Sequence, residues 1–326
     1  MIGAGDPAPR LRRSRRIALA LAVAFAGAFV LAAALAGRLD QVLAELQALP
    51  PWLVLAVAAM SLANFALRAW RWHIAQGRIG IVLPWHRTLL YYMAGYALLL
   101  TPGRIGEAVR LWLLRRGHGA RYERSFALLA VDRLADGVVF VLFILAGLAS
   151  FSGYGVIAAG VALLLGVALW LFLRPGPLLA ATGWAYGRTR RWPRAFARVR
   201  AALRQGRRIG RPALLVPALA LSVVAWTVLA AGFTLLLQAL AIPAGLADAM
   251  FVLGLASAAG ALIVVPGGLG GTEGAMLVLL AGMGATTQTA IAATLVIRAL
   301  TLWLSVAIGF AALALAVRLT TPGRVP

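Results

Sequence analysis

The chain has 326 residues, of which 63% are hydrophobic and only 12% are charged. This composition is too apolar for a soluble protein, and several runs reach the roughly 18–20 residues that a membrane-spanning helix needs. There is no cysteine, and the three histidines do not stand at ligand spacing, so disulfides and metal sites are not expected. The composition therefore predicts an all-α polytopic membrane protein.

All 31 basic residues are arginines, and the formal net charge is +22. In a soluble protein this charge would suggest nucleic acid, but no basic–aromatic or fingerprint motif supports that partner. The arginines cluster between apolar runs, where positive charge indicates cytoplasmic loops and contact with anionic lipid. We therefore expect lipid contact and no nucleic acid.

The first two apolar runs predict two spans. Residues 1–16 form a basic N-terminus, and residues 17–37 are continuously apolar. A secretory signal is the alternative, but the run is longer than a typical signal core, which favours a retained span entering from the cytoplasm. Residues 51–70 predict the returning span. We interpret the residues at its end, Arg68, Trp70, Arg71 and Trp72, as an interfacial anchor.

The next apolar piece is interrupted at Pro102 and Gly103, where a helix is expected to break. As helices, residues 88–100 would measure about 20 Å and residues 104–114 about 16 Å. Neither crosses a hydrocarbon core of about 30 Å. Arginines both precede and follow the piece, so we predict a re-entrant hairpin from the cytoplasm, with a kinked span as the alternative.

Residues 125–149 then predict an outward span and residues 156–173 a returning one. Residues 174–211 contain eleven arginines and no acid, which predicts a cytoplasmic loop that contacts anionic lipid headgroups. Apolar residues recur there at helical spacing: Phe196, Val199 and Leu203. They favour an amphipathic helix on the membrane surface, and a merely solvated loop is the alternative.

The second half repeats this order from the opposite side. Residues 213–240 run outward, residues 249–281 break at Pro266 and Gly267, and residues 291–317 return to a cytoplasmic tail, residues 319–326. The sum is about six full spans and two re-entrant or broken helices, arranged as an inverted 4+4 repeat. One membrane domain, residues 17–318, would hold repeat one (about 17–149) and repeat two (about 156–318), with both termini cytoplasmic.

Both breaks share the pattern Pro-Gly-x-(Ile/Leu)-Gly followed by glutamate. The predicted hinge residues are Pro102, Gly103, Gly106, Pro266, Gly267, Gly268 and Gly270. Glu107 and Glu273 are the acids, and Arg133 and Arg298 follow them at nearly equal distances. Matched broken helices that carry charges are typical of a transporter site.

Several ionisable residues fall in predicted membrane segments. The predicted substrate-binding residues are Arg104, Glu107, Asp132, Arg133, Asp136, Glu273 and Arg298. Without Arg104 these are six charges, which would cost on the order of 15–20 kcal/mol if they were unpaired near the bilayer centre, so these groups must pair, reach water or titrate.

The arginines Arg104, Arg133 and Arg298 could clamp a phosphate, with ion pairs that only hold helices together as the alternative. Glu107 and Glu273 would balance charge or carry protons, or serve as partners of the arginines. Glu107 lies three residues from Arg104 and Arg110, so an ion pair within that half-helix is available. We interpret three further arginines as interfacial snorkelling residues: Arg110, Arg115 and Arg116.

No Walker loop, nucleophile elbow or zinc-protease motif occurs, so neither an enzyme nor a cofactor is expected. Five short motifs in order resemble the lysylphosphatidylglycerol synthase transmembrane-region (flippase-like domain) family. They are Trp70-Arg71-Trp72, Pro102 to Glu107 with Arg110, Asp132 to Asp136, Pro266 to Gly270 with Glu273, and Arg298-Ala299-Leu300.

The resemblance implies a multi-pass bacterial inner-membrane protein, a standalone member without the synthase domain, that moves a phospholipid or related envelope amphiphile. The alternatives are a membrane-embedded lipid-modifying enzyme and a non-transporting partner in an envelope lipid biosynthesis complex. Whether the chain forms a homo-oligomer stays open.

Overall fold

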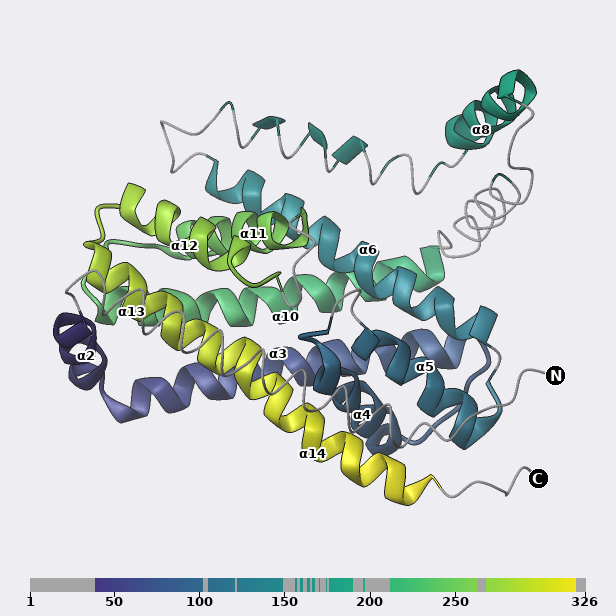
Figure 1. Cartoon of the computed structure of the whole chain (residues 1–326), viewed down its shortest axis with the longest axis horizontal. Helices are drawn as coiled ribbons and strands as arrows, with labels where there is room; N and C mark the ends of the chain where they lie inside the picture. Colours follow the sequence, from purple (N-terminus) through teal and green to yellow (C-terminus); the bar gives the residue numbers. More distant parts are fainter. Residues whose placement is uncertain are drawn as a thin grey trace.

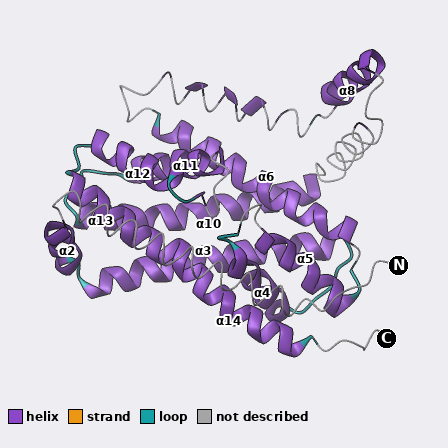
Figure 2. Cartoon of the chain, viewed as in Figure 1, coloured by secondary structure: helices purple, strands orange, loops and turns teal. Residues whose placement is uncertain are grey.

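The computed structural model describes residues 39–101, 105–120, 122–148, 176–189, 212–262 and 268–320, with scattered positions between 156 and 174 and residue 196. These residues form helices and connecting turns (Figure 2). The predicted first span lies outside the described residues, as do Pro102, Gly103, Arg104, Pro266, Gly267 and the segment around Val199 and Leu203. The expectation of an all-helical membrane protein is confirmed by the described residues.

The helices follow one another as in Figure 1. They are α2 (Leu39–Ala48), α3 (Pro51–Arg78), α4 (Trp85–Ala94), the 3₁₀-helix η1 (Gly95–Leu98), α5 (Ile105–His118), α6 (Tyr122–Gly147), α8 (Gly176–Thr189), α10 (Pro212–Ala239), α11 (Leu246–Leu262), α12 (Gly271–Gly282), α13 (Thr287–Arg298), the π-helix η4 (Ala299–Trp303) and α14 (Leu304–Leu319).

Three helical segments among the described residues are long and apolar enough to cross a membrane: α3, α10 and the continuous run from α13 to α14. α6 is 26 residues long, but it carries Asp132, Arg133 and Asp136 near its middle. At 1.5 Å per residue its length is about 39 Å, which exceeds the hydrocarbon thickness. α6 is therefore long enough to cross a membrane, and it differs from the three apolar segments in the charged residues near its middle.

Two broken units separate the long helices. The first consists of α4, η1 and α5, which pack against one another, and the second of α11 and α12, which also pack together. η1 ends at Leu98 and α5 begins at Ile105, while α11 ends at Leu262 and α12 begins at Gly271. The longest of these helices, α11, measures about 26 Å, so no single arm spans the hydrocarbon core.

Glycines allow the arms of each unit to cross closely. A Cβ on Gly106 of α5 would collide with the backbone carbonyl of Gly95 in η1. A Cβ on Gly260 of α11 would collide with the Thr272 hydroxyl in α12. Side chains larger than hydrogen would push the arms apart at both points.

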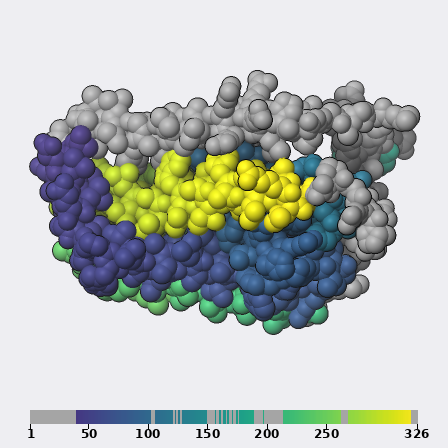
Figure 3. All heavy atoms as spheres, turned by 90° about the horizontal axis from the view of Figure 1, so that it is seen from below, coloured from purple at the N-terminus to yellow at the C-terminus, as the bar shows by residue number. Residues whose placement is uncertain are grey.

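The two broken units approach each other in the middle of the molecule. Leu100, just after η1, and Leu269, just before α12, share one buried cluster with Leu302 and Val306 of the π-helix and α14. In Figure 1 the bodies of the two units lie toward opposite ends of the long axis, while α8 lies apart from the bundle. On the face shown in Figure 3, α3, α4 and α14 form adjoining bands. Leu100 and Leu269, the described leucines that flank the two breaks, therefore lie close together in the interior.

Candidate functional site

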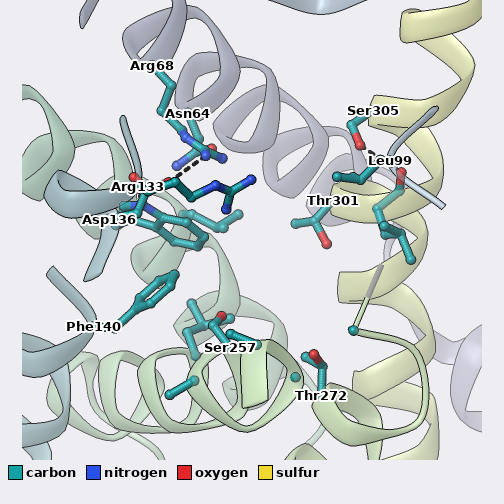
Figure 4. A pocket seen from close by; sticks show the side chains of 18 of the residues that line it. Asn64, Arg68, Leu99, Arg133, Asp136, Phe140, Ser257, Thr272, Thr301 and Ser305 are labelled. Atoms are coloured by element: carbon teal, nitrogen blue, oxygen red, sulfur yellow. Dashed lines mark hydrogen bonds and ion pairs between the residues drawn. The ribbon is translucent and has the colours of Figure 1, made fainter. Parts of the chain in front are cut away.

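A cavity of about 490 Å³ lies where the broken units meet α3, α6, α10 and the α13–α14 segment (Figure 4). Its volume is in the usual range for small-molecule sites. The charged residues that line it are Arg68, Glu107, Arg110, Asp132, Arg133, Asp136 and Arg298. Four arginines thus face three carboxylates along this wall.

Asp136 of α6 is the acid at the centre of a buried charge cluster. Its carboxylate accepts from Arg68 at 2.7 Å and from Arg71 at 2.8 Å, both on α3. The indole N–H of Trp226 on α10 donates to the same carboxylate at 3.0 Å. Three helices are therefore joined at one buried acid.

Asp132, one turn earlier on α6, extends the cluster to the first broken unit. It forms an ion pair with Arg71 and lies 3.5 Å from Nη1 of Arg110 on α5. Arg71 also donates to the Ser222 hydroxyl on α10. We call Arg68, Arg71, Arg110, Asp132 and Asp136 the charge cluster. Because Asp132 and Asp136 lie four residues apart on one helix face, both reach α3.

Aromatic rings surround the guanidinium of Arg110. Its central carbon lies 3.7 Å from the ring centre of Tyr92 and 5.0 Å from that of Tyr96, and Nε donates to the Tyr92 carbonyl at 3.1 Å. The residue is only 4% exposed. The interpretation of Arg110 as an interfacial snorkelling residue is therefore wrong, because rings and Asp132 take the place of water around its charge.

The interpretation of Arg68 to Trp72 as an interfacial anchor is also wrong for its inner members. Arg71 is 1% exposed and Trp72 is 3% exposed, whereas Trp70 is 43% exposed. α3 continues to Arg78, which places this stretch inside the helix and not at its end. Arg68 and Arg71 are three residues apart and share a face opposite Asp132 and Asp136, a complementary spacing that the sequence offered.

Each broken unit also contributes one glutamate. It pairs with the arginine that follows it by about 25 residues in the sequence. Glu107 accepts from Nε of Arg133 at 3.2 Å. Glu273 accepts from Nε of Arg298 at 2.6 Å. Both glutamates are the third residue of their helices, α5 and α12. We call these the first pair (Glu107–Arg133) and the second pair (Glu273–Arg298).

The two pairs differ in exposure and in anchoring. The Arg133 side chain is 41% exposed, and that of Arg298 is 13% exposed. Glu273 also accepts from the backbone N–H of Gly270 at 2.8 Å, which closes a capping interaction at the start of α12. The second pair is thus part of the helix end, while the first pair faces a more open part of the cavity.

The structure brings most of the predicted substrate-binding residues together. Asp132 and Asp136 belong to the charge cluster, and Glu107, Arg133, Glu273 and Arg298 form the two pairs. The ion pair suggested between Glu107 and Arg110 is not the one observed, because Arg110 turns to Asp132 and Glu107 to Arg133. Arg104 lies outside the described residues.

Three of the predicted hinge glycines, Gly106, Gly268 and Gly270, are among the described residues and lie at the ends and crossings of the broken units. Gly268 and Gly270 have φ values of 68° and 83°, a backbone region that favours glycine. Gly106 is the close crossing on η1 described above. These placements are compatible with hinges, and motion at these positions stays a prediction.

The fold and the cavity together define a class: a helical membrane protein with paired charges at interrupted helices. The model of the family described as lysylphosphatidylglycerol synthase TM region matches residues 17–309. The chain belongs to that family. A comparison with curated proteins gave no significant match.

Proposed function

We propose that this protein is a lipid flippase or translocase that moves a phospholipid or related envelope amphiphile across the bacterial inner membrane. The charged headgroup would enter the central cavity while the acyl chains stay in the lipid. The observation that carries the proposal is the set of four arginines on the wall of a cavity at the junction of two broken helices. Guanidinium groups bind phosphate oxygens in bidentate fashion.

The proposed topology has six full spans and two re-entrant units in an inverted 4+4 repeat, with both termini in the cytoplasm. It is supported by the matched position of the two pairs, each with its glutamate at the third residue of a half-helix. The acid and arginine stand 26 residues apart in the first pair and 25 in the second. Such equivalence is what two copies of one unit would produce.

Arg133 is the best placed of the lining arginines to receive a phosphate. Its side chain is the more exposed member of the first pair, so a phosphate could share or replace Glu107 without burying an extra charge. Arg298 and Arg104 would bind the same phosphate together with Arg133. Glu107 and Glu273 would neutralise these arginines when the site holds no lipid.

The test is lipid movement in reconstituted vesicles that carry a fluorescent phospholipid, with dithionite quenching the outer leaflet. Wild-type protein should expose the inner-leaflet label, and protein-free vesicles should not. Arg133→Ala should slow this step about tenfold or more, because a charge-assisted hydrogen bond contributes about 1.5–3 kcal/mol. Arg298→Ala and Arg104→Ala should also slow it while insertion is kept.

Arg115→Ala is the matched control, because Arg115 stacks on Tyr122 outside the residues named for the cavity. Equal loss of folded protein in the Arg298 and Arg104 variants would favour ion pairs that only hold helices together. Wild-type vesicles that quench no faster than empty ones would reject transport in favour of a scaffold. A modified lipid detected by mass spectrometry would favour a membrane-embedded enzyme.

A further inference from the structure

α2 belongs to the first half of the chain but packs against the second half. Val42, which is 2% exposed, shares a buried cluster with Ile291 and Ala292 of α13. The carboxylate of Glu45 accepts from the hydroxyl of Thr289, also on α13, at 3.2 Å. In Figure 1 α2 lies at one end of the long axis, beside the starts of α3 and α13. One short helix therefore joins segments that are 244 residues apart in the sequence.

α2 connects the starts of α3 and α13. Among the described elements α3 packs chiefly against α10, whereas α13 packs against α12 and α2. α2 passes into α3 through the buried Leu49 and then Pro50 and Pro51, and Pro50 is extended, with φ −61° and ψ 133°. A proline fixes its own φ and restricts the residue before it, so two consecutive prolines form a stiff corner. A movement of α3 is therefore passed on to α2.

The end of the molecule that carries α2 is closed in this structure. The cavity reaches Asn64 on α3 and Ile297 on α13, and none of its lining residues lies nearer to the starts of these two helices. Between the cavity and that end, both helices contribute buried residues to the same core, among them Val57 and Ala293. At 1.5 Å per residue this closed section of α3 is about 20 Å long. A headgroup in the cavity therefore leaves toward this end only when the helices that close it move apart.

The contact between α2 and α13 is small enough to open. Val42 is the one buried residue of α2, and Leu43 beside it is 43% exposed. Glu45 is held by a single side-chain hydrogen bond, and its partner Thr289 also bonds to the hydroxyl of Thr286 at 2.7 Å. Release of α2 therefore exposes a small apolar contact and leaves every one of these polar groups with water or with a neighbour.

We propose that α2 is a strap. Docked on α13, it keeps this end of the cavity closed, and it leaves α13 when a headgroup passes toward that side of the membrane, which is the outer side in the proposed topology. This inference rests on the proposed function, since such a strap matters only in a protein that opens to both sides. It assigns a role to Val42, Glu45 and Thr289, none of which lines the cavity.

A reversible cross-link tests the strap, because the sequence contains no cysteine and an introduced pair can be joined selectively. In the full-length Glu45→Cys/Thr289→Cys variant, a short bis-thiosulfonate linker should tie α2 to α13. Lipid movement in vesicles would be followed by extraction of the fluorescent lipid with albumin, since dithionite would reduce the linker. Cross-linking should slow movement about tenfold or more, because transport falls with the population of the open state, and dithiothreitol should restore the rate.

Gln41→Cys/Glu45→Cys is the matched control for the linker. These two positions lie one turn apart on α2, so the same linker joins them and leaves α13 free. Its rate should be the same before and after cross-linking. Each variant is compared with itself before the linker is added, so any effect of the cysteines on folding cancels.

Spin labels test the release of α2 without requiring transport. Gln41→Cys and Thr287→Cys place the labels at exposed positions of α2 and α13 and keep the bond of Glu45. In lipid nanodiscs, double electron–electron resonance should give a short distance for the docked strap and a longer one for the released strap. Val42→Asn should raise the released share about tenfold, because it buries an amide in an apolar contact. Leu43→Asn is the control, since Leu43 is exposed.

A single docked distance in both the wild type and Val42→Asn would overturn the inference. So would an unchanged rate of lipid movement in fully cross-linked Glu45→Cys/Thr289→Cys, which would keep the proposed function and reject the strap. Two distances in a protein that moves no lipid would keep the releasable α2 and reject the proposed function.

Discussion

The two halves of the molecule contain the same ion pair in different surroundings. In both halves a glutamate at the third residue of a half-helix meets an arginine of the next long helix. Among the described residues the first half has the charge cluster beside its pair, and in the second half Glu273 also accepts from the N–H of Gly270 at the helix end. The shared pair is what the proposed repeat would produce, and the surroundings of the two pairs differ.

From the difference in exposure we infer that the two pairs have different roles in the cavity. The first pair, with Arg133 41% exposed, stands at the accessible side. The second pair, with Arg298 13% exposed and Glu273 4% exposed, stands at the closed side. A headgroup in the proposed pathway would therefore reach the first pair before the second.

The largest expected effect comes from the charge cluster, which the described residues show in the first half. Asp136→Asn removes a charge that balances Arg68 and Arg71, and breaking such a buried ion pair costs about 3–5 kcal/mol. We expect a large fall in thermal stability and in yield of monodisperse protein. Asp248→Asn is the control, since Asp248 is an exposed cap for the N–H of Gly245. Similar losses in the two variants would contradict a special role for the charge cluster.

The helix crossings should show an intermediate effect that differs between the halves. Gly106→Ala meets a backbone carbonyl, which cannot turn away, whereas Gly260→Ala meets the hydroxyl of Thr272. Both should lose about 1–3 kcal/mol of stability from overpacking. Thr272→Ala should rescue Gly260→Ala in a thermal unfolding measurement. No side-chain change is expected to rescue Gly106→Ala.

An absence of rescue in the double variant, with a stable Thr272→Ala single variant, would show that α11 and α12 do not cross at this point. The experiment thus separates two kinds of close approach, backbone against backbone and backbone against side chain. It also tests whether the two broken units are equivalent in packing as well as in sequence pattern.

Much of the fold could be predicted because apolar runs and breaks are local signals. Pro102-Gly103 and Pro266-Gly267 predicted interruptions between residues that the structure assigns to separate helices, η1 and α5 or α11 and α12. Six of the seven residues expected at the site proved to be joined by ion pairs. Buried charge in an apolar chain must find partners, so the existence of pairs followed from the composition.

The identity of the partners did not follow, because it depends on how distant helices pack. Arg71 and Asp132 are 61 residues apart, and nothing local indicates that α3 lies against α6. Arg110 was interpreted, together with Arg115 and Arg116, as an interfacial residue. Its aromatic surroundings come from Tyr92 and Tyr96 of the preceding arm.

The smallest effect should come from the two pairs themselves, and it compares the halves most directly. Glu107→Ala removes the partner of a half-exposed arginine, and exposed ion pairs contribute about 0–1 kcal/mol. Glu273→Ala removes a buried partner and a helix cap together, and the cap alone contributes about 1 kcal/mol. Glu273→Ala should therefore lower the melting temperature clearly more than Glu107→Ala.

Glu273→Gln refines this comparison, because glutamine still accepts from the Gly270 N–H but no longer balances Arg298. Its stability should fall between the wild type and Glu273→Ala. If Glu107→Ala is instead the more damaging of the two alanine variants, the accessible side of the cavity has been assigned to the wrong half. In that case Arg298, and not Arg133, becomes the first arginine that a headgroup meets.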